Sequence, residues 1–269
     1  MKTKKIFFPA GMLTALLLLS TAFTNVSALP IDTVKNTSFQ PGEKVTYRIA
    51  YHYSSLWMSA GDATFKCEES TYNNKPVYHF TCYGSTYSSY DWFYKVRDKY
   101  ESYTDETTAL PIKFIRDVNE GGYIIYNNVT FDHVNKKATS TNGTYTIPLN
   151  TQDLISCIYW ARNIDFTNKA VGDKIPFNLF IDDSTYALYV KYCGKEKITT
   201  TAGTFNCIKF KPLLINGNMF KGGEGMTVWV TDDLNHVPVR IESEIQVGAI
   251  AADAYKFEGL KNPMTAKVK

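Results

Sequence analysis

Apolar and polar residues alternate along most of this 269-residue chain. In residues 44–53, large apolar or aromatic side chains occupy every second position, which is the spacing of a strand with one buried face. The same period recurs in 123–131, 175–181, 186–192, 226–230 and 237–241. Turn-forming residues separate these runs, as at Asn73-Asn74, Asn142-Gly143 and Asp182-Asp183. We therefore expect about 12 to 14 strands, joined mostly by short hairpins.

The alternation and the aromatic content together predict an all-β fold. The chain contains 19 Tyr, 16 Phe and 4 Trp, and aromatic residues favour strands. A meander of antiparallel strands hides its edges by curling, so we expect a strongly curved antiparallel sheet, either a half-barrel or a barrel. One central helix is predicted from Thr151 to Asn163, because apolar residues follow Asp153 at helical spacing. A second helical turn is expected around Ser88 to Phe93.

The N-terminus has the pattern of a secretory signal. Lys2, Lys4 and Lys5 precede an apolar stretch in residues 6–23, and the small residues Val26-Ser27-Ala28 follow it. A retained membrane anchor is the alternative, but Pro9 and Gly11 interrupt the apolar stretch and a span needs about 20 apolar residues. We expect a signal peptide in residues 1–28, cleavage near Ala28, and a periplasmic or secreted protein. Residues 29–37 and 261–269 are expected to be flexible, with one β-rich domain at 38–260.

Charge and motifs exclude several classes of protein. The formal net charge is +3, and loss of three Lys with the signal peptide leaves a neutral chain, which does not favour binding to nucleic acid or an anionic membrane. The rest of the sequence has no apolar segment long enough to span a membrane, so we do not expect an integral membrane protein. The sequence has no GxSxG, HExxH, GxxxxGK[ST] or GxGxxG motif, and its four His are scattered. We therefore expect no catalytic residues, no metal site and no cofactor.

Five cysteines are present in a chain predicted to be exported. Cys67 and Cys82 flank the expected hairpin turn at Asn73-Asn74, and a disulfide there is one hypothesis. Buried, unpaired thiols are the favoured alternative. The pairing of Cys157, Cys193 and Cys207 stays open.

The densest group of charges lies in residues 97–120. Alternation places Arg97, Lys99 and Glu101 on one face of a strand, which favours ordinary cross-strand ion pairs. Asp98 falls on the other face. The functional alternative is a polar site inside the curved sheet, formed by Asp98 and Arg116.

Several segments resemble an exported family, domain of unknown function 3108. The residues that carry the resemblance are 41–47, 91–103, 110–111, 120–123, 151–156, 229–233, 238–241 and 248–250. The resemblance covers about residues 38–260 and implies no established activity. The stretch 229–241 is also similar, at the level of the fold, to the closing strands of periplasmic lipoprotein-carrier half-barrels, in which a helix covers a sheet that holds acyl chains. Fold alone does not determine function.

Two functions follow as hypotheses. In the first, the protein binds a lipid or other apolar small molecule of the envelope in its curved sheet. The residues expected to line that site are Trp57, Met58, Tyr90, Trp92, Phe93, Tyr159 and Trp160. In the alternative, the protein is an envelope structural or assembly protein that contacts a protein partner through strand edges. An enzyme is the third and weakest hypothesis, since no nucleophile–base pair is recognised.

Overall fold

Antiparallel hairpins build almost the whole fold. The computed structural model describes residues 34–53, 56–92, 94–216, 221–245 and 248–268. The expected signal peptide, its cleavage site and residues 29–33 therefore lie outside the described part. Within that part, no helix is long and apolar enough to cross a membrane. All of the described residues belong to one compact unit, Ile31–Lys269.

The first half of the chain folds into eight consecutive strands with one short 3-10 helix. Their bounds are β1 (Lys44–Tyr53), β2 (Leu56–Tyr72), β3 (Lys75–Thr86), η1 (Ser88–Tyr90), β4 (Val96–Asp105), β5 (Pro111–Glu120), β6 (Tyr123–Asp132), β7 (Lys137–Ser140) and β8 (Gly143–Thr146). The helical turn expected around Ser88 is present as η1.

The second half contains nine strands and the α-helix. Their bounds are β9 (Thr151–Gln152), α1 (Ser156–Ala161), β10 (Lys174–Ile181), β11 (Ser184–Thr200), β12 (Gly203–Pro212), β13 (Leu214–Asn216), β14 (Lys221–Gly223), β15 (Met226–Thr231), β16 (Pro238–Glu244) and β17 (Ala249–Glu258). The described residues thus form 17 strands, more than expected, because alternation is hard to detect in strands of two to four residues such as β9 and β13.

Fifteen strands form one sheet in the order β8-β7-β6-β5-β4-β3-β2-β1-β17-β16-β15-β12-β11-β10-β9. The first strand pairs with the last, so the two halves of the chain share the sheet. Every pairing within it is antiparallel except that of β9 with β10. Residues with positive φ make the tight turns, as at Asn73 (φ 49°) and Asn74 (φ 62°) between β2 and β3, which is the geometry of a type I′ hairpin. The predicted all-β antiparallel fold is confirmed.

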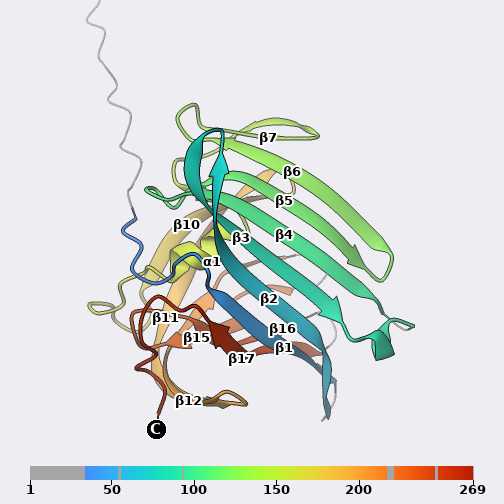
Figure 1. Ribbon diagram of the computed structural model, residues 1–269, viewed down its shortest axis with the longest axis vertical. Coiled ribbons are helices and arrows are strands. Elements are labelled where there is room, and N and C mark those ends of the chain that lie inside the picture. The colour runs from blue at the N-terminus through green and yellow to red at the C-terminus, as the bar shows by residue number, and fades with distance from the viewer. Residues whose placement is uncertain (1–33, 54–55, 93, 217–220, 246–247, 269) are drawn as a thin grey trace, which may run out of the picture. The chain divides into compact units, whose positions relative to one another are not determined.

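The sheet is curved strongly enough to bring distant strands together. Figure 1 shows β2 to β6 as one bent layer in front of β10 and β11. Near the turn between β10 and β11, Asn142 Nδ2 donates to Asp183 Oδ2 at 2.6 Å. The rings of Phe131 in β6 and Phe180 in β10 have centroids 6.0 Å apart. These contacts join strands that are far apart in the sheet order, as a β-barrel-like closure requires.

The helix is shorter than the predicted span of Thr151 to Asn163. Thr151 and Gln152 are in β9 and pair with Asn178 and Leu179 of β10, and α1 covers only Ser156–Ala161. The backbone of Thr151 and Gln152 is buried against β10, and parallel pairing satisfies polar groups that a helix would otherwise have satisfied. This partner is distant in sequence, so the local pattern could not reveal it.

Tyr159 and Trp160 of α1 pack into two different clusters of buried side chains. One cluster includes Phe80, Phe114, Phe180 and Tyr159. In the other, Trp160 packs with residues such as Val190. Because consecutive residues of α1 enter different clusters, this short helix connects the two parts of the core.

All five cysteines are free thiols. The disulfide hypothesis fails because Cys67 pairs with Phe80 in the β2–β3 ladder, whereas Cys82 pairs with Phe65. The two thiols are therefore offset along the hairpin instead of facing each other. Burial raises the pKa of the Cys82 thiol to about 12, so this thiol stays protonated.

The described residues at both ends of the domain make specific contacts. Lys267 forms a β-bridge with Phe205, and the buried Ala266 accepts the Asn206 N–H at 2.9 Å. Near the N-terminus, the Thr37 N–H donates to Asn163 Oδ1 at 2.9 Å. These contacts involve residues 37, 266 and 267, and the flexible ends expected at residues 29–37 and 261–269 stay a prediction.

Candidate ligand-binding site

Asp153 positions the N-terminal end of α1. Its Oδ1 accepts the backbone N–H groups of Ile155 and Ser156, both at 2.7 Å. Ser156 Oγ accepts the Asp153 N–H at 2.9 Å, which completes a reciprocal cap. Asp153 Oδ2 also accepts the Ser102 hydroxyl at 2.5 Å. Burial raises the pKa of Asp153 to about 6, against the lowering effect of these hydrogen bonds.

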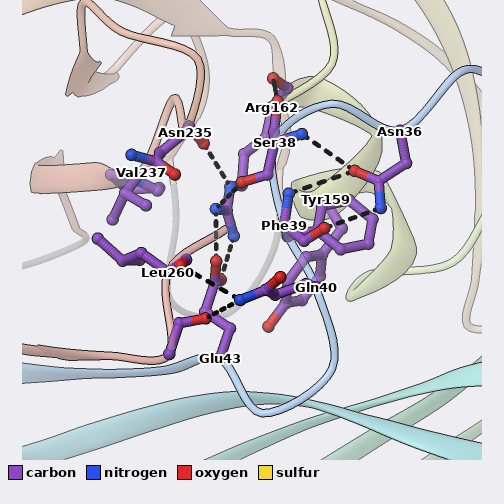
Figure 2. Close-up of polar contacts among 12 residues, drawn as sticks. Asn36, Ser38, Phe39, Gln40, Glu43, Tyr159, Arg162, Asn235, Val237 and Leu260 are labelled. Carbon is purple, nitrogen blue, oxygen red and sulfur yellow. Dashed lines mark hydrogen bonds and ion pairs between the residues drawn. The ribbon is translucent and has the colours of Figure 1, made fainter. Parts of the chain in front are cut away.

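Arg162 holds the other end of α1 through a buried ion pair with Glu43. Figure 2 shows the guanidinium pointing at this carboxylate, and its Nη2 lies 2.9 Å from Glu43 Oε2. Only 4% of the Arg162 side chain and 1% of the Glu43 side chain is exposed. Arg162 also donates to the carbonyl oxygens of Ser38 and Asn235, at 2.9 and 3.1 Å. The interaction therefore joins the N-terminal segment, α1 and the loop before β16.

Tyr159 and Trp160 have different surroundings although they are adjacent in sequence. Tyr159 is 3% exposed and stacks on Phe80 with centroids 3.7 Å apart, so it is a core residue. Trp160 is half-buried, and its ring centroid lies 5.4 Å from that of Phe177 in β10. Because both ends of α1 are fixed, the indole of Trp160 is held in a defined position.

Two pockets adjoin Trp160. The first, which we call the Gln152 pocket, has a volume of about 330 Å³. Its lining includes Val34, Leu110, Gln152, Trp160, Phe177 and Leu188. The second, which we call the Lys35 pocket, has a volume of about 510 Å³ and is lined in part by Val34, Lys35, Trp160, Asp165, Lys169 and Ile175. The lining of the Gln152 pocket is mostly apolar, whereas that of the Lys35 pocket includes the charged residues Lys35, Asp165 and Lys169.

Of the other residues expected at the site, Met58, Tyr90 and Trp92 are not among those that line the two pockets. Tyr90 is in η1 and Trp92 follows it with 85% of its surface exposed. Met58 pairs with Tyr51 at the start of β2. The side chain of Trp57 and the whole of Phe93 lie outside the described part of the structure. Phe80, which stacks on Tyr159, lies six residues before the end of β3. The end of β3, which η1 follows, is therefore about 20 Å along the strand from this contact.

Asp98 and Arg116 share a face of the sheet but bind different partners. Asp98 pairs with Val118, and Arg116 pairs with Tyr100, in the β4–β5 ladder. Asp98 Oδ1 accepts the Asn119 N–H at 3.1 Å, whereas Arg116 forms an ion pair with Asp182 in the β10–β11 turn. Burial and the nearby Glu120 raise the pKa of Asp98 to about 6.

On the opposite face of β4, Glu101 contacts one side chain of its own strand and one of the neighbouring strand β3. Lys99 Nζ lies 2.6 Å from Glu101 Oε1, and His79 Nε2 lies 2.9 Å from Glu101 Oε2. The Lys99–Glu101 ion pair lies within β4, and of these two contacts only that between His79 and Glu101 crosses to another strand. Over the described residues, no group of His, Cys, Asp or Glu side chains could hold a metal ion.

Sequence reasoning did not identify Gln152, Glu43 or Arg162 as important to this region. Gln152 was placed in the helix, where it had no reason to face a pocket. Glu43 and Arg162 are 119 residues apart, and no local pattern relates them. An indirect signal for Gln152 was its position next to a helix cap in a chain with few helices.

Comparison with known proteins supports the fold and the family. The structure superposes with a TM-score of 0.53 on the crystal structure of a β-barrel-like protein of domain of unknown function DUF1849 from Brucella abortus. The identity is 9%, and the match covers 82% of this chain and 98% of that one.

Two further structures match with lower TM-scores. A "putative lipoprotein" from Parabacteroides distasonis has a TM-score of 0.38 and 14% identity, with 84% of this chain and 99% of that chain covered. A "putative exported protein" with a YmcC-like fold from Bacteroides fragilis has a TM-score of 0.34 and 10% identity, with 83% and 99% covered. No curated protein matches the chain significantly. The model of the family described as protein of unknown function DUF3108 matches residues 46–255, and because this is well over half of the sequence, the chain belongs to the DUF3108 family.

Proposed function

We propose that this protein is exported and binds an apolar, lipid-like ligand of the cell envelope against Trp160. The observation that carries the proposal is that one half-buried indole lines both pockets. Trp160 is also the one residue of the expected aromatic set that lines either pocket, within the part of the chain that the structure describes. The basic, apolar and small-residue pattern of residues 1–28 supports export.

The sizes of both pockets and the mostly apolar lining of the Gln152 pocket suit such a ligand. Small-molecule sites usually have volumes of about 300 to 1,000 Å³, with mostly apolar walls and a few polar groups. The two volumes, about 330 and 510 Å³, fall in this range. Each methylene moved from water to the pocket contributes about 0.8 kcal/mol. About ten methylenes therefore contribute about 8 kcal/mol, which equals the free energy of micromolar binding before the cost of ordering the chain is subtracted.

Binding of a fluorescent acyl-chain probe without a charged group tests this proposal. We expect Trp160→Ala to weaken uptake of the probe by about tenfold, because the substitution removes the wall shared by the pockets. Trp92→Ala is the matched control, since this Trp is 85% exposed and is not among the lining residues. The proposal fails if wild type binds no probe, or if folded Trp160→Ala binds it as tightly as wild type.

A second candidate function is contact with another envelope protein. Its support is a group of exposed large side chains near η1 and the β5–β6 turn, namely Trp92 (85%), Tyr94 (45%), Tyr123 (55%), Ile124 (68%) and Tyr126 (60%). Exposed apolar patches often mark an interaction site, and Ile124 and Tyr126 share one face of β6. Cross-linking in intact cells tests this function: a Tyr126→Ser, Ile124→Ser variant should lose a cross-linked partner that Trp160→Ala retains. Equal cross-linking by the two variants would contradict it.

A further inference from the structure

Gln152 has an acceptor atom that no protein group uses. Its side chain is 2% exposed and lines the Gln152 pocket. The amide Nε2 donates to the Ala109 carbonyl oxygen at 3.3 Å. The Oε1 atom has no hydrogen-bond partner among the described residues. A buried acceptor without a donor costs free energy, so native proteins seldom leave one unmatched.

The orientation of this amide follows from its partner. A backbone carbonyl can only accept a hydrogen bond, so the NH₂ group of Gln152 must face Ala109. Rotating the amide by half a turn would put two acceptors together and would also leave the NH₂ without its partner. The position of Gln152 is set by β9, where it pairs with Leu179 of β10. The contacts with Ala109 and β10 therefore fix the position of the acceptor in a side chain that lines the pocket.

The surroundings of this acceptor are neutral. Apart from Gln152, the polar residues of the Gln152 pocket are Thr108, Asn150 and Asn178, and none of its lining residues is charged. The hydroxyl of Thr108 already donates to Asp105 Oδ1 at 3.0 Å. An ionised carboxylate is acceptor-only, so it cannot donate to Gln152 Oε1, and no Lys or Arg lines the pocket to neutralise its charge. An ammonium group would lose its hydration without a carboxylate to pair with.

We propose that the Gln152 pocket takes a neutral ligand that combines an apolar chain with a hydroxyl or amide N–H group, which donates a hydrogen bond to Gln152 Oε1. This inference rests on the proposed function and narrows the class of ligand. Long-chain alcohols, acylglycerols and fatty amides have this chemistry, whereas free fatty acids at neutral pH do not. Val34, Leu110 and Leu188 contact the apolar chain, and Trp160 covers it.

Competition against the neutral acyl-chain probe tests the inference on wild-type protein. The competitors are decanol, decyl methyl ether and decanoate. They share the alkyl chain, but at neutral pH only the alcohol donates a hydrogen bond. We expect decanol to compete about tenfold better than the ether, since the ether leaves Oε1 without a donor. Decanoate should compete no better than the ether.

Two variants separate this inference from the proposed function. Gln152→Met keeps the length of the side chain but removes the acceptor, so it should bind decanol and the ether equally. Trp160→Ala should weaken both and keep the ratio between them. Circular dichroism and thermal unfolding check that each variant is folded.

The wild-type result alone can overturn the inference. Equal competition by decanol and the ether, in wild type that binds the probe, means that the ligand does not donate to Gln152 Oε1, for example because an ordered water does. In that case the inference fails and the proposed function stands. A preference for decanol that persists in folded Gln152→Met also overturns it. If wild type does not bind the probe at all, both fail together.

Discussion

Two aromatic-rich regions of this protein differ in the contacts that hold their side chains in place. Around α1, Trp160 lies between two pockets, and the helix is fixed at both ends by buried groups. Around η1, Trp92 is 85% exposed, and the nearby ion pair between Arg97 and Asp91 joins residues only six positions apart. The first region is assembled from distant segments, and the second is mostly local.

The difference shows that aromatic content alone does not mark a binding site. Each region has a Trp beside other aromatic residues in sequence. A site also needs space next to the side chain and a support that keeps the space open. Glu43 and Arg162 provide such support across 119 residues. Substitutions in the α1 region should therefore have large effects, and those around η1 small ones.

Breaking the buried ion pair should have the largest effect. Arg162→Met leaves the Glu43 carboxylate buried without its partner and should lower the free energy of unfolding by about 3 to 5 kcal/mol. Urea unfolding measures the change. The double variant Glu43→Gln, Arg162→Met removes both charges and should recover part of the loss. An Arg162→Met variant within about 0.5 kcal/mol of wild type would show that the two regions are held alike.

A smaller effect is expected from the charge on Asp153. Its pKa is about 6 in the folded protein, above the ordinary value of 3.8, so the folded state binds more protons than the unfolded state between these values. Asp153 therefore favours folding most below about pH 4, and this contribution is lost as the pH rises through about 6.

Asp153→Asn isolates this contribution, because the amide oxygen can still accept the N–H groups of Ile155 and Ser156. From pH 4 to pH 8, the stability of this variant relative to wild type should rise by at most about 3 kcal/mol. Chemical unfolding at several pH values measures this difference. A difference that stays constant with pH would contradict the pKa shift. Asp98 is only half-buried, and Asp98→Asn should give a smaller change in the same direction.

The smallest effects come from the two Trp residues themselves, and they sharpen the comparison most directly. Trp160→Ala removes contacts with Phe177 and should cost about 1 to 2 kcal/mol, less than a fully buried Trp, because pockets adjoin it. Trp92→Ala should change stability by less than about 0.5 kcal/mol. Thermal unfolding of the two variants provides the measurement. Equal losses would mean that Trp92 is packed as closely as Trp160.

Strands and turns could be predicted from the sequence because their signals are local. The alternation in residues 44–53 became β1, and Asn73-Asn74 became the β2–β3 turn. The helix was overextended because pairing of Thr151 and Gln152 with β10 depends on a segment beyond the helix.

Only part of the candidate site could be predicted, for the same reason. Trp160 was expected at the site, but Trp92 has an equally aromatic local sequence and lies elsewhere. The position of Gln152 depends on Ala109 and β10, which lie far from it in sequence. Local sequence contains no information about either neighbour.

The pairing of β1 with β17 has a consequence for the order of folding. Lys44 lies opposite Glu258 in this ladder, so the central pair of strands closes a loop of nearly the whole domain. Contacts between such distant residues form slowly, because the entropy of loop closure must be overcome before they stabilise the chain. Until the last strand arrives, the inner edges of β1 and β16 have no neighbour, and open edges invite pairing with other chains. A chain that emerges with its N-terminus first therefore completes its sheet only when nearly all of it has emerged. We expect that a chaperone bound in that interval would protect both edges.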